Sequence, residues 1–227
     1  MIKNISNLGD AAVYCDFGSE VNQEINQIVI SYFNTIRKTI DRENIKGILN
    51  LTPSYNKLIV SFDLSLTNFS KVKKVIQNVK IDSQKNILSN KIKIPVCIDE
   101  EFSFDFKRIT KITSKPKEKF LEIFFQKEYF CYMTGFIAGM PFLGDLNEEI
   151  RCDRLETPRL KVPEGSIGLT EQFANIYTSE SPGGWNIIGN TPLKVFDKKN
   201  QKKPNLINPG DKINFYEISK IEYDNWK

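Results

Sequence analysis

IKGILNLTPSYNKLIVSFDL, residues 45–64, contains two apolar runs separated by a short polar segment. Residues 45–52 are typical of a strand that stops at Pro53, and residues 58–64 are typical of a returning strand. Pro, Ser and Asn between the two runs favour a turn. The stretch therefore predicts a pair of antiparallel strands.

A helical pattern lies on each side of this pair. Before it, apolar residues spaced three and four apart predict a helix that begins at Asn22 and runs to about Lys38. After it, the same spacing predicts a second helix that starts at Asn68 or Ser70. Each helix can cover one face of a small sheet.

Two further apolar runs complete the pattern of the first half. DAAVYCDF at residues 10–17 predicts a first strand, and KIKIPVCI at residues 91–98 predicts a fourth. The resulting order β-α-β-β-α-β is that of the ferredoxin-like, split βαβ arrangement. We therefore predict an α+β protein in which residues 1–98 form a small ferredoxin-like domain.

The second half of the chain changes character. Residues 99–128 are charged and favour helices, with Phe120, Ile123 and Phe124 as an apolar stripe for the core. After residue 128, short apolar runs alternate with Gly and Pro, as in YFCYMTGFIAGMPFLG at residues 129–144. That punctuation indicates a barrel or a sandwich. Residues 99–227 are therefore predicted to be a second, β-rich domain with leading helices.

Composition excludes several classes of function. The chain has 227 residues, of which 40% are hydrophobic and 26% charged, so a disordered chain is excluded. Its net charge of +4 is small, and we expect no nucleic-acid partner. The absence of histidine excludes Ser-His-Asp and Cys-His catalysis and His-ligated zinc. Acid–base chemistry must fall to carboxylates, Lys, Tyr or Cys.

Cysteine usage and the first residues bear on location. The four cysteines form no CxxC pair, so we expect reduced structural thiols and no metal site. MIKNISNLGDAAVY at residues 1–14 contains no apolar core of a signal peptide. No apolar run approaches the ~20 residues of a membrane helix. These features predict a cytoplasmic protein with no membrane partner.

Four stretches of the second half resemble the motifs of one family and occur in the same order and spacing. They are GFIAGMPFLGDL (135–146), DRLETPRLKVPEGSIGL (153–169), IYTSESPGGWNIIGNTPLKVFD (176–197) and NPGDKINF (208–215). The chain resembles the family of 5-oxoprolinase B subunits, also called allophanate hydrolase subunit 1, carboxyltransferase subdomains C and D, or the sporulation-kinase inhibitor family. NLGDAAVYCDFG at residues 7–18 extends the resemblance to the first half.

The resemblance implies a small α/β domain followed by a cyclophilin-like β-barrel. It also implies a B subunit that works with a carboxyltransferase-like C subunit and with a barrel-like A subunit. Together they would use ATP to open 5-oxoproline, a small lactam, to glutamate. ATP with Mg is the expected cofactor, bound either in contact with this chain or mainly by the partner subunit, and this chain is expected to be inactive alone.

Two other functions are implied by branches of the family. One is a non-catalytic regulatory protein that binds a histidine kinase. The other is an amide-processing subunit of the allophanate or urea type.

Lactam cleavage driven by ATP requires groups that bind a carboxylate, a polarised amide oxygen and phosphate. Arginine suits bidentate anion binding. Arg154 and Arg159 match two arginines of the family, and Lys161 would share a face with Arg159 on an extended segment. These three are the predicted catalytic residues. The alternative for the arginines is a surface ion pair.

A second set is predicted to bind the substrate through backbone N–H groups, hydroxyls and an aromatic wall. Its members are Gly139, Ser166, Tyr177, Gly183, Gly184 and Trp185. The alternative for the two adjacent glycines is a tight turn, and for the tryptophan it is the core.

The chain departs from the family pattern at three places. Phe124 stands where the family usually has a histidine, and Ala138 stands where it has proline. A Gln-Thr pair of the family corresponds to Phe173 and Ala174. These departures leave the identity of the substrate open.

Overall fold

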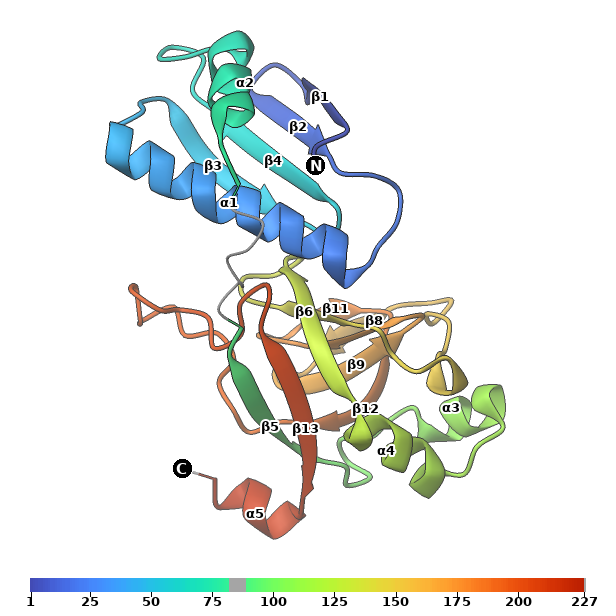
Figure 1. The fold of residues 1–227 in the computed structure, drawn as a ribbon. Helices are drawn as coiled ribbons and strands as arrows, with labels where there is room; N and C mark the ends of the chain where they lie inside the picture. Colours follow the sequence, from blue (N-terminus) through green and yellow to red (C-terminus); the bar gives the residue numbers. More distant parts are fainter. Residues whose placement is uncertain (82–88, 227) are drawn as a thin grey trace. The chain divides into compact units, whose positions relative to one another are not determined.

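The computed structural model describes residues 1–81 and 89–226 (Figure 1). Contacts divide the chain into two compact units, Met1–Leu88 and Ser89–Lys227. Each unit has a hydrophobic core of its own, so each is described by itself.

The first unit is a four-stranded antiparallel sheet with the order β1-β2-β4-β3 and two helices. Its elements are β1 (Asn4–Asn7), β2 (Ala12–Asp16), α1 (Gln23–Glu43), β3 (Ile48–Pro53), β4 (Lys57–Phe62) and α2 (Phe69–Asn78). The predicted strand pair of residues 45–64 is confirmed as β3 and β4.

Both helices begin where a polar side chain can bond a free backbone N–H. The side chain of Asn22 accepts a hydrogen bond from Ile25 N, and that of Asn68 accepts one from Lys71 N. The first helix runs five residues beyond the predicted end, to Glu43, and stops at Asn44 with a left-handed φ of 50°. Val29 and Ile36 of α1 and Val72 and Ile76 of α2 are buried in the same core.

The second unit is a closed barrel with the strand order β10-β7-β6-β13-β5-β12-β9. Its strands are β5 (Lys91–Cys97), β6 (Glu128–Thr134), β7 (Pro141–Gly144), β9 (Ser166–Thr170), β10 (Phe173–Ile176), β12 (Asn186–Asn190) and β13 (Lys212–Ile218). The α+β class and the predicted barrel of the second half are confirmed.

Further elements surround the barrel. They are α3 (Phe106–Thr113), α4 (Lys117–Gln126), the 3-10 helix Glu148–Ile150, the strand pair β8 (Arg159–Val162) and β11 (Ser181–Gly183), and α5 (Lys220–Asp224). The predicted apolar stripe lies in the core, because Phe120 and Phe124 of α4 are fully buried. Phe124 stacks on Phe215 of β13 with ring centroids 5.0 Å apart.

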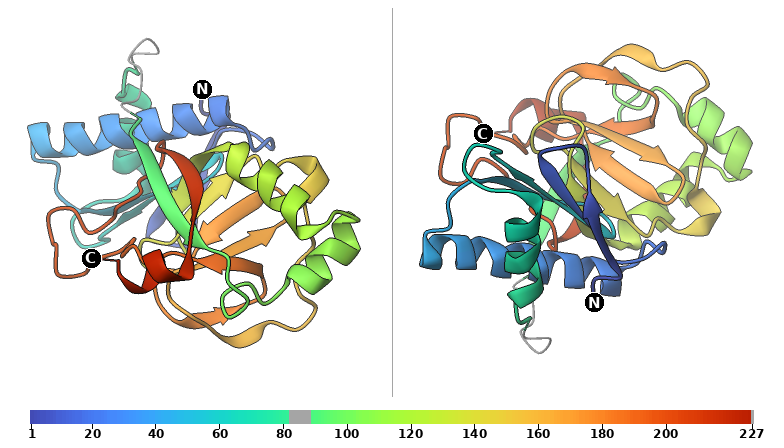
Figure 2. Two further views of the ribbon diagram at one scale, coloured as in Figure 1. Left: turned by 90° about the horizontal axis from the view of Figure 1, so that it is seen from below. Right: turned by 90° about the horizontal axis from the view of Figure 1, so that it is seen from above.

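The prediction that residues 91–98 belong to the first domain is wrong. β5 pairs in parallel with β13 along its whole length, from Lys91 opposite Lys212 to Cys97 opposite Ile218 (Figure 1 and Figure 2). The fourth place in the first sheet is taken by β1. The boundary between the units therefore falls after residue 88, and the first unit is not a ferredoxin-like βαββαβ domain. Its order is ββαββα.

Among the helices of the described residues, none combines the length and the apolar composition that a membrane-spanning helix requires.

Candidate functional site

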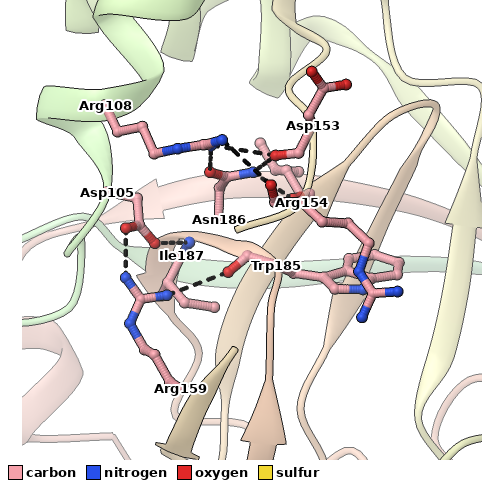
Figure 3. Close-up of polar contacts among 9 residues, drawn as sticks. Asp105, Arg108, Asp153, Arg154, Arg159, Trp185, Asn186 and Ile187 are labelled. Atoms are coloured by element: carbon pink, nitrogen blue, oxygen red, sulfur yellow. Dashed lines mark hydrogen bonds and ion pairs between the residues drawn. The ribbon is translucent and has the colours of Figure 1, made fainter. Parts of the chain in front are cut away.

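Arg159, the first residue of β8, forms an ion pair with a buried carboxylate (Figure 3). Its Nη2 lies 2.5 Å from Oδ1 of Asp105, and the two side chains are 27% and 7% exposed. Its Nη1 donates a longer bond of 3.4 Å to the carbonyl of Trp185. The guanidinium is thus held by two protein acceptors, while about a quarter of the side chain, 27%, stays exposed.

Asp105 immediately precedes α3, in a position where aspartate usually caps a helix. Its side chain makes no capping bond. Its Oδ2 instead accepts a hydrogen bond of 2.6 Å from the backbone N of Ile187 in β12. The carboxylate is therefore fixed to the barrel, where its other oxygen meets Arg159.

Arg108, one helical turn after Asp105, joins a second polar network. It donates to the side-chain oxygen of Asn186, to the carbonyl of Asp153 at 3.2 Å and to the carbonyl of Arg154 at 3.3 Å. Asn186 is fully buried and also donates to the carbonyl of Asp153, at 2.9 Å. Together they fix the backbone from which the side chain of Arg154 extends (Figure 3).

Arg154 is exposed, and its guanidinium forms no hydrogen bond or ion pair with any residue of the described chain. The backbone beside it is anchored by a bond of 2.8 Å from Leu155 N to the carbonyl of Gly184. A methyl group at Gly184 would lie 3.7 Å from an Nη atom of Arg154. The backbone that carries Arg154 is therefore anchored, and the N–H donors of its guanidinium are available to a ligand.

Tyr177 lies against the same strand pair. Its side chain is buried, and a methyl group at Gly183 would lie 2.2 Å from its hydroxyl oxygen. Burial raises the pKa of Tyr177, while bonds from Asn175 and from the backbone of Trp185, and the charges of Arg154 and Arg159, oppose that rise. Glycine at position 183 thus allows the phenol to approach the backbone.

Trp185 is half-buried, and its ring meets that of Phe142 edge-on, with centroids 5.5 Å apart. The structure therefore brings together five of the predicted site residues: Arg154, Arg159, Tyr177, Gly183 and Trp185. Gly184 adjoins them through its contact with Arg154.

The other predicted residues have different surroundings. Lys161 is 76% exposed and pairs with Glu180, 56% exposed, at 3.0 Å. It is not among the groups bonded to Arg159, and the pairing of β8 with β11 shifts register between Arg159 and Val162. Ser166 is buried in β9, where its backbone carbonyl accepts a bond of 2.9 Å from Tyr177 N.

Gly139 forms a turn before β7. Its φ is +72°, and a methyl group there would lie 2.5 Å from the ring of Phe196. Both facts favour glycine for structural reasons. The neighbouring Met140 packs in one buried cluster with Tyr177.

Sequence reasoning missed Asp105, Arg108 and Asn186. The first two belong to the stretch DEEFSFDFKRIT, whose composition indicates only charge and a tendency to form helices. Arginine is scarce in this chain, with six in total, so the Asp-x-x-Arg spacing at 105–108 was an available signal.

The cluster offers N–H donors that suit a small anion. Arg108 and Arg159 donate to protein groups, although Arg159 keeps further N–H donors, whereas the guanidinium of Arg154 has no partner in the described residues. In the described residues, no group of three His, Cys, Asp or Glu side chains could hold a metal.

Comparison with known proteins identifies the family. Residues 3–207 match the model of the carboxyltransferase domain, subdomain C and D. The chain is 31% identical over 235 residues to the B subunit of 5-oxoprolinase from Bacillus subtilis, and the match covers 98% of this chain and 96% of that one. It is 20% identical to the urea amidolyase of Saccharomyces cerevisiae over 95% of this chain, which is only 13% of that protein.

Solved structures agree on the fold. The crystal structure of TTHA0988 superposes on 92% of this chain with a TM-score of 0.80 at 24% identity, and this chain spans about two fifths of its length, 40%. An uncharacterised protein from Pyrococcus horikoshii superposes over 97% of this chain with a TM-score of 0.57 at 33% identity. The chain belongs to the family of 5-oxoprolinase B subunits, whose domain is the carboxyltransferase domain, subdomain C and D.

Proposed function

We propose that this chain is the B subunit of an ATP-dependent 5-oxoprolinase, an amidohydrolase complex that opens 5-oxoproline to glutamate. The observation that carries the proposal is the similarity to the Bacillus subtilis protein over almost the whole of both chains. In this proposal the chain acts with a carboxyltransferase-like C subunit and with a barrel-like A subunit, and it is inactive alone.

The polar cluster supplies groups for such a substrate. The open guanidinium of Arg154 would bind the carboxylate of 5-oxoproline in a bidentate manner. Arg159 has five N–H donors, of which Asp105 and Trp185 use two. Its remaining donors would polarise the amide oxygen, which becomes more negative as the amide is activated. Trp185 would form a wall of the site.

We assign ATP and Mg mainly to the partner subunit. This assignment rests on the small number of open cationic donors in the cluster, which are the guanidinium of Arg154 and the remaining N–H groups of Arg159, because a triphosphate requires several cations. No chemical step on the nucleotide is assigned to residues of this chain.

A urea-type substrate is the second candidate. The similarity to urea amidolyase extends over 95% of this chain, although identity is only 20%. Urea itself has no carboxylate to pair with the open guanidinium of Arg154, whereas allophanate carries one. The role of this arginine therefore separates 5-oxoproline from urea but not from allophanate.

The test is ATP hydrolysis by this chain with its cognate subunits, with and without 5-oxoproline. We expect stimulation that requires 5-oxoproline and the complete set of subunits, and its loss in Arg154→Ala. Glu149→Gln, which removes an exposed partner of Lys115, is the matched control and should retain activity.

An assembled complex that hydrolyses ATP with urea but not with 5-oxoproline would support the second candidate. Assembly without turnover on either compound would contradict an enzymatic role and leave the kinase-binding function to be tested.

A further inference from the structure

The start of α3 departs from the usual behaviour of a helix N-terminus. Aspartate at the position before a helix normally accepts a hydrogen bond from a backbone N–H of the first turn. Asp105 makes no such bond, and both of its oxygens are directed to groups of the β-strands. A buried carboxylate that does not cap its own helix is expected to serve another interaction.

The compensating contact is with Arg159. An arginine side chain has many rotamers, and one that is 27% exposed can sample them unless a partner holds it. Asp105 is itself immobilised, because Ile187 N donates to its second oxygen and its own N donates to Ile187 O at 3.2 Å. The carboxylate therefore sets the position of the guanidinium relative to β12.

Arg108 fixes the backbone that carries the second arginine of the site, Arg154. Its contacts with the carbonyls of Asp153 and Arg154 tie the loop to α3. These contacts involve only backbone carbonyls. The backbone of Arg154 is therefore fixed, while its guanidinium can still bind a ligand.

We propose that Asp105 and Arg108 are positioning residues, which orient the guanidinium of Arg159 and the backbone of Arg154 for substrate. Neither residue touches the substrate in this scheme. The inference builds on the proposed function, since it concerns the same site.

The first experiment is a double-mutant cycle on turnover by the assembled complex. Asp105→Asn should lower kcat/KM for 5-oxoproline by about 10–100-fold, as expected when a reacting group is displaced by about 1 Å. If Asp105 acts through Arg159, the same change in an Arg159→Lys background should cost less than about threefold. Asp105→Glu, which restores the charge, should recover part of the loss.

Two further double-mutant cycles on turnover serve as controls. Arg108→Gln should be coupled to Arg154→Lys in the same way, whereas Asp105→Asn and Arg154→Lys should act independently. Equal losses from Asp105→Asn in both backgrounds would overturn the assignment of Asp105, because a merely structural role would not depend on Arg159. Unchanged kcat/KM in an active complex would overturn it as well.

A second measurement does not depend on activity. The chain has six arginines, so their Nε–Hε signals can be resolved and assigned by NMR with Arg159→Lys. The {1H}–15N NOE of Arg159 should be that of a rigid group and should fall to that of a mobile side chain in Asp105→Asn. If the complex proves inactive on 5-oxoproline, the proposed function fails while this NOE still decides the positioning role. A mobile Arg159 in the parent chain would refute it.

Discussion

Asp105 and Ile187 exchange two hydrogen bonds although they are 82 residues apart. The backbone N of Asp105 donates to Ile187 O at 3.2 Å, and Ile187 N donates to Oδ2 of Asp105 at 2.6 Å. One residue of the segment before α3 is thus bonded to a barrel strand through its backbone and its side chain. This double attachment explains how a buried carboxylate can hold Arg159 in place.

Replacing Arg159 tests its assignment to the site. Arg159→Ala should abolish turnover by the complex, with a loss of at least about 100-fold, because it removes the proposed donors to the amide oxygen. The fold should persist but lose about 3 kcal/mol of unfolding free energy, since Asp105 would remain buried without its cation. Turnover assays and urea unfolding followed by tryptophan fluorescence check both effects. Full turnover in Arg159→Ala would contradict the assignment.

The two adjacent glycines offer a matched pair of substitutions. A methyl group at Gly183 would lie 2.2 Å from the Tyr177 hydroxyl oxygen, whereas at Gly184 its nearest neighbour would be 3.6 Å away. Gly183→Ala should therefore cost about 1–3 kcal/mol through overpacking, and Gly184→Ala should cost much less. Thermal unfolding of the two variants measures the difference. Equal melting temperatures would show that Tyr177 moves aside freely.

Lys161 is expected to be dispensable, in contrast to the prediction made from its spacing. Its ion pair with Glu180 is exposed, and such pairs contribute about 0–1 kcal/mol. Lys161→Ala should change turnover by less than about threefold and stability by less than about 0.5 kcal/mol. A loss comparable to that of Arg159→Ala would return Lys161 to the catalytic set.

Local features of the fold could be predicted because their causes are local. The caps at Asn22 and Asn68 and the turn between β3 and β4 depend on residues within a few positions of one another. The pairing of β5 with β13 joins Lys91 to Lys212, and no periodicity within either strand reveals its partner. Sequence adjacency wrongly favoured the first sheet for residues 91–98.

The residues of the candidate site also divide into those that could be predicted from the sequence and those that could not. Arg154 and Arg159 could be found because arginine is scarce and because the motifs resemble a family. Asp105 could not be paired with Arg159 from the sequence, since 54 residues separate them and the pair forms only when α3 meets the strands. The register shift between Arg159 and Val162 could not be predicted either, because it depends on how β11 pairs with β8.

A buried thiol in the first unit makes stability depend on pH. Cys15 in β2 is fully buried, and burial raises its pKa to about 12. The unfolded chain releases the thiol proton near its ordinary pKa of about 8.5, so it binds fewer protons than the folded chain above that pH. Stability is therefore complete below about pH 8 and falls between about pH 9 and 12, by up to about 1.4 kcal/mol per pH unit for this thiol.

Comparison with Cys15→Ala isolates this effect from other groups that titrate in the same range. The cavity left by the substitution lowers stability by an amount that does not depend on pH. The gap in unfolding free energy between the parent chain and the variant should therefore narrow by about 2.5 kcal/mol from pH 8 to pH 10.5. Circular dichroism is the suitable probe, because α1 belongs to the first unit whereas both tryptophans, Trp185 and Trp226, belong to the second. Parallel pH profiles would mean that the Cys15 thiol ionises in the folded protein at an ordinary pKa.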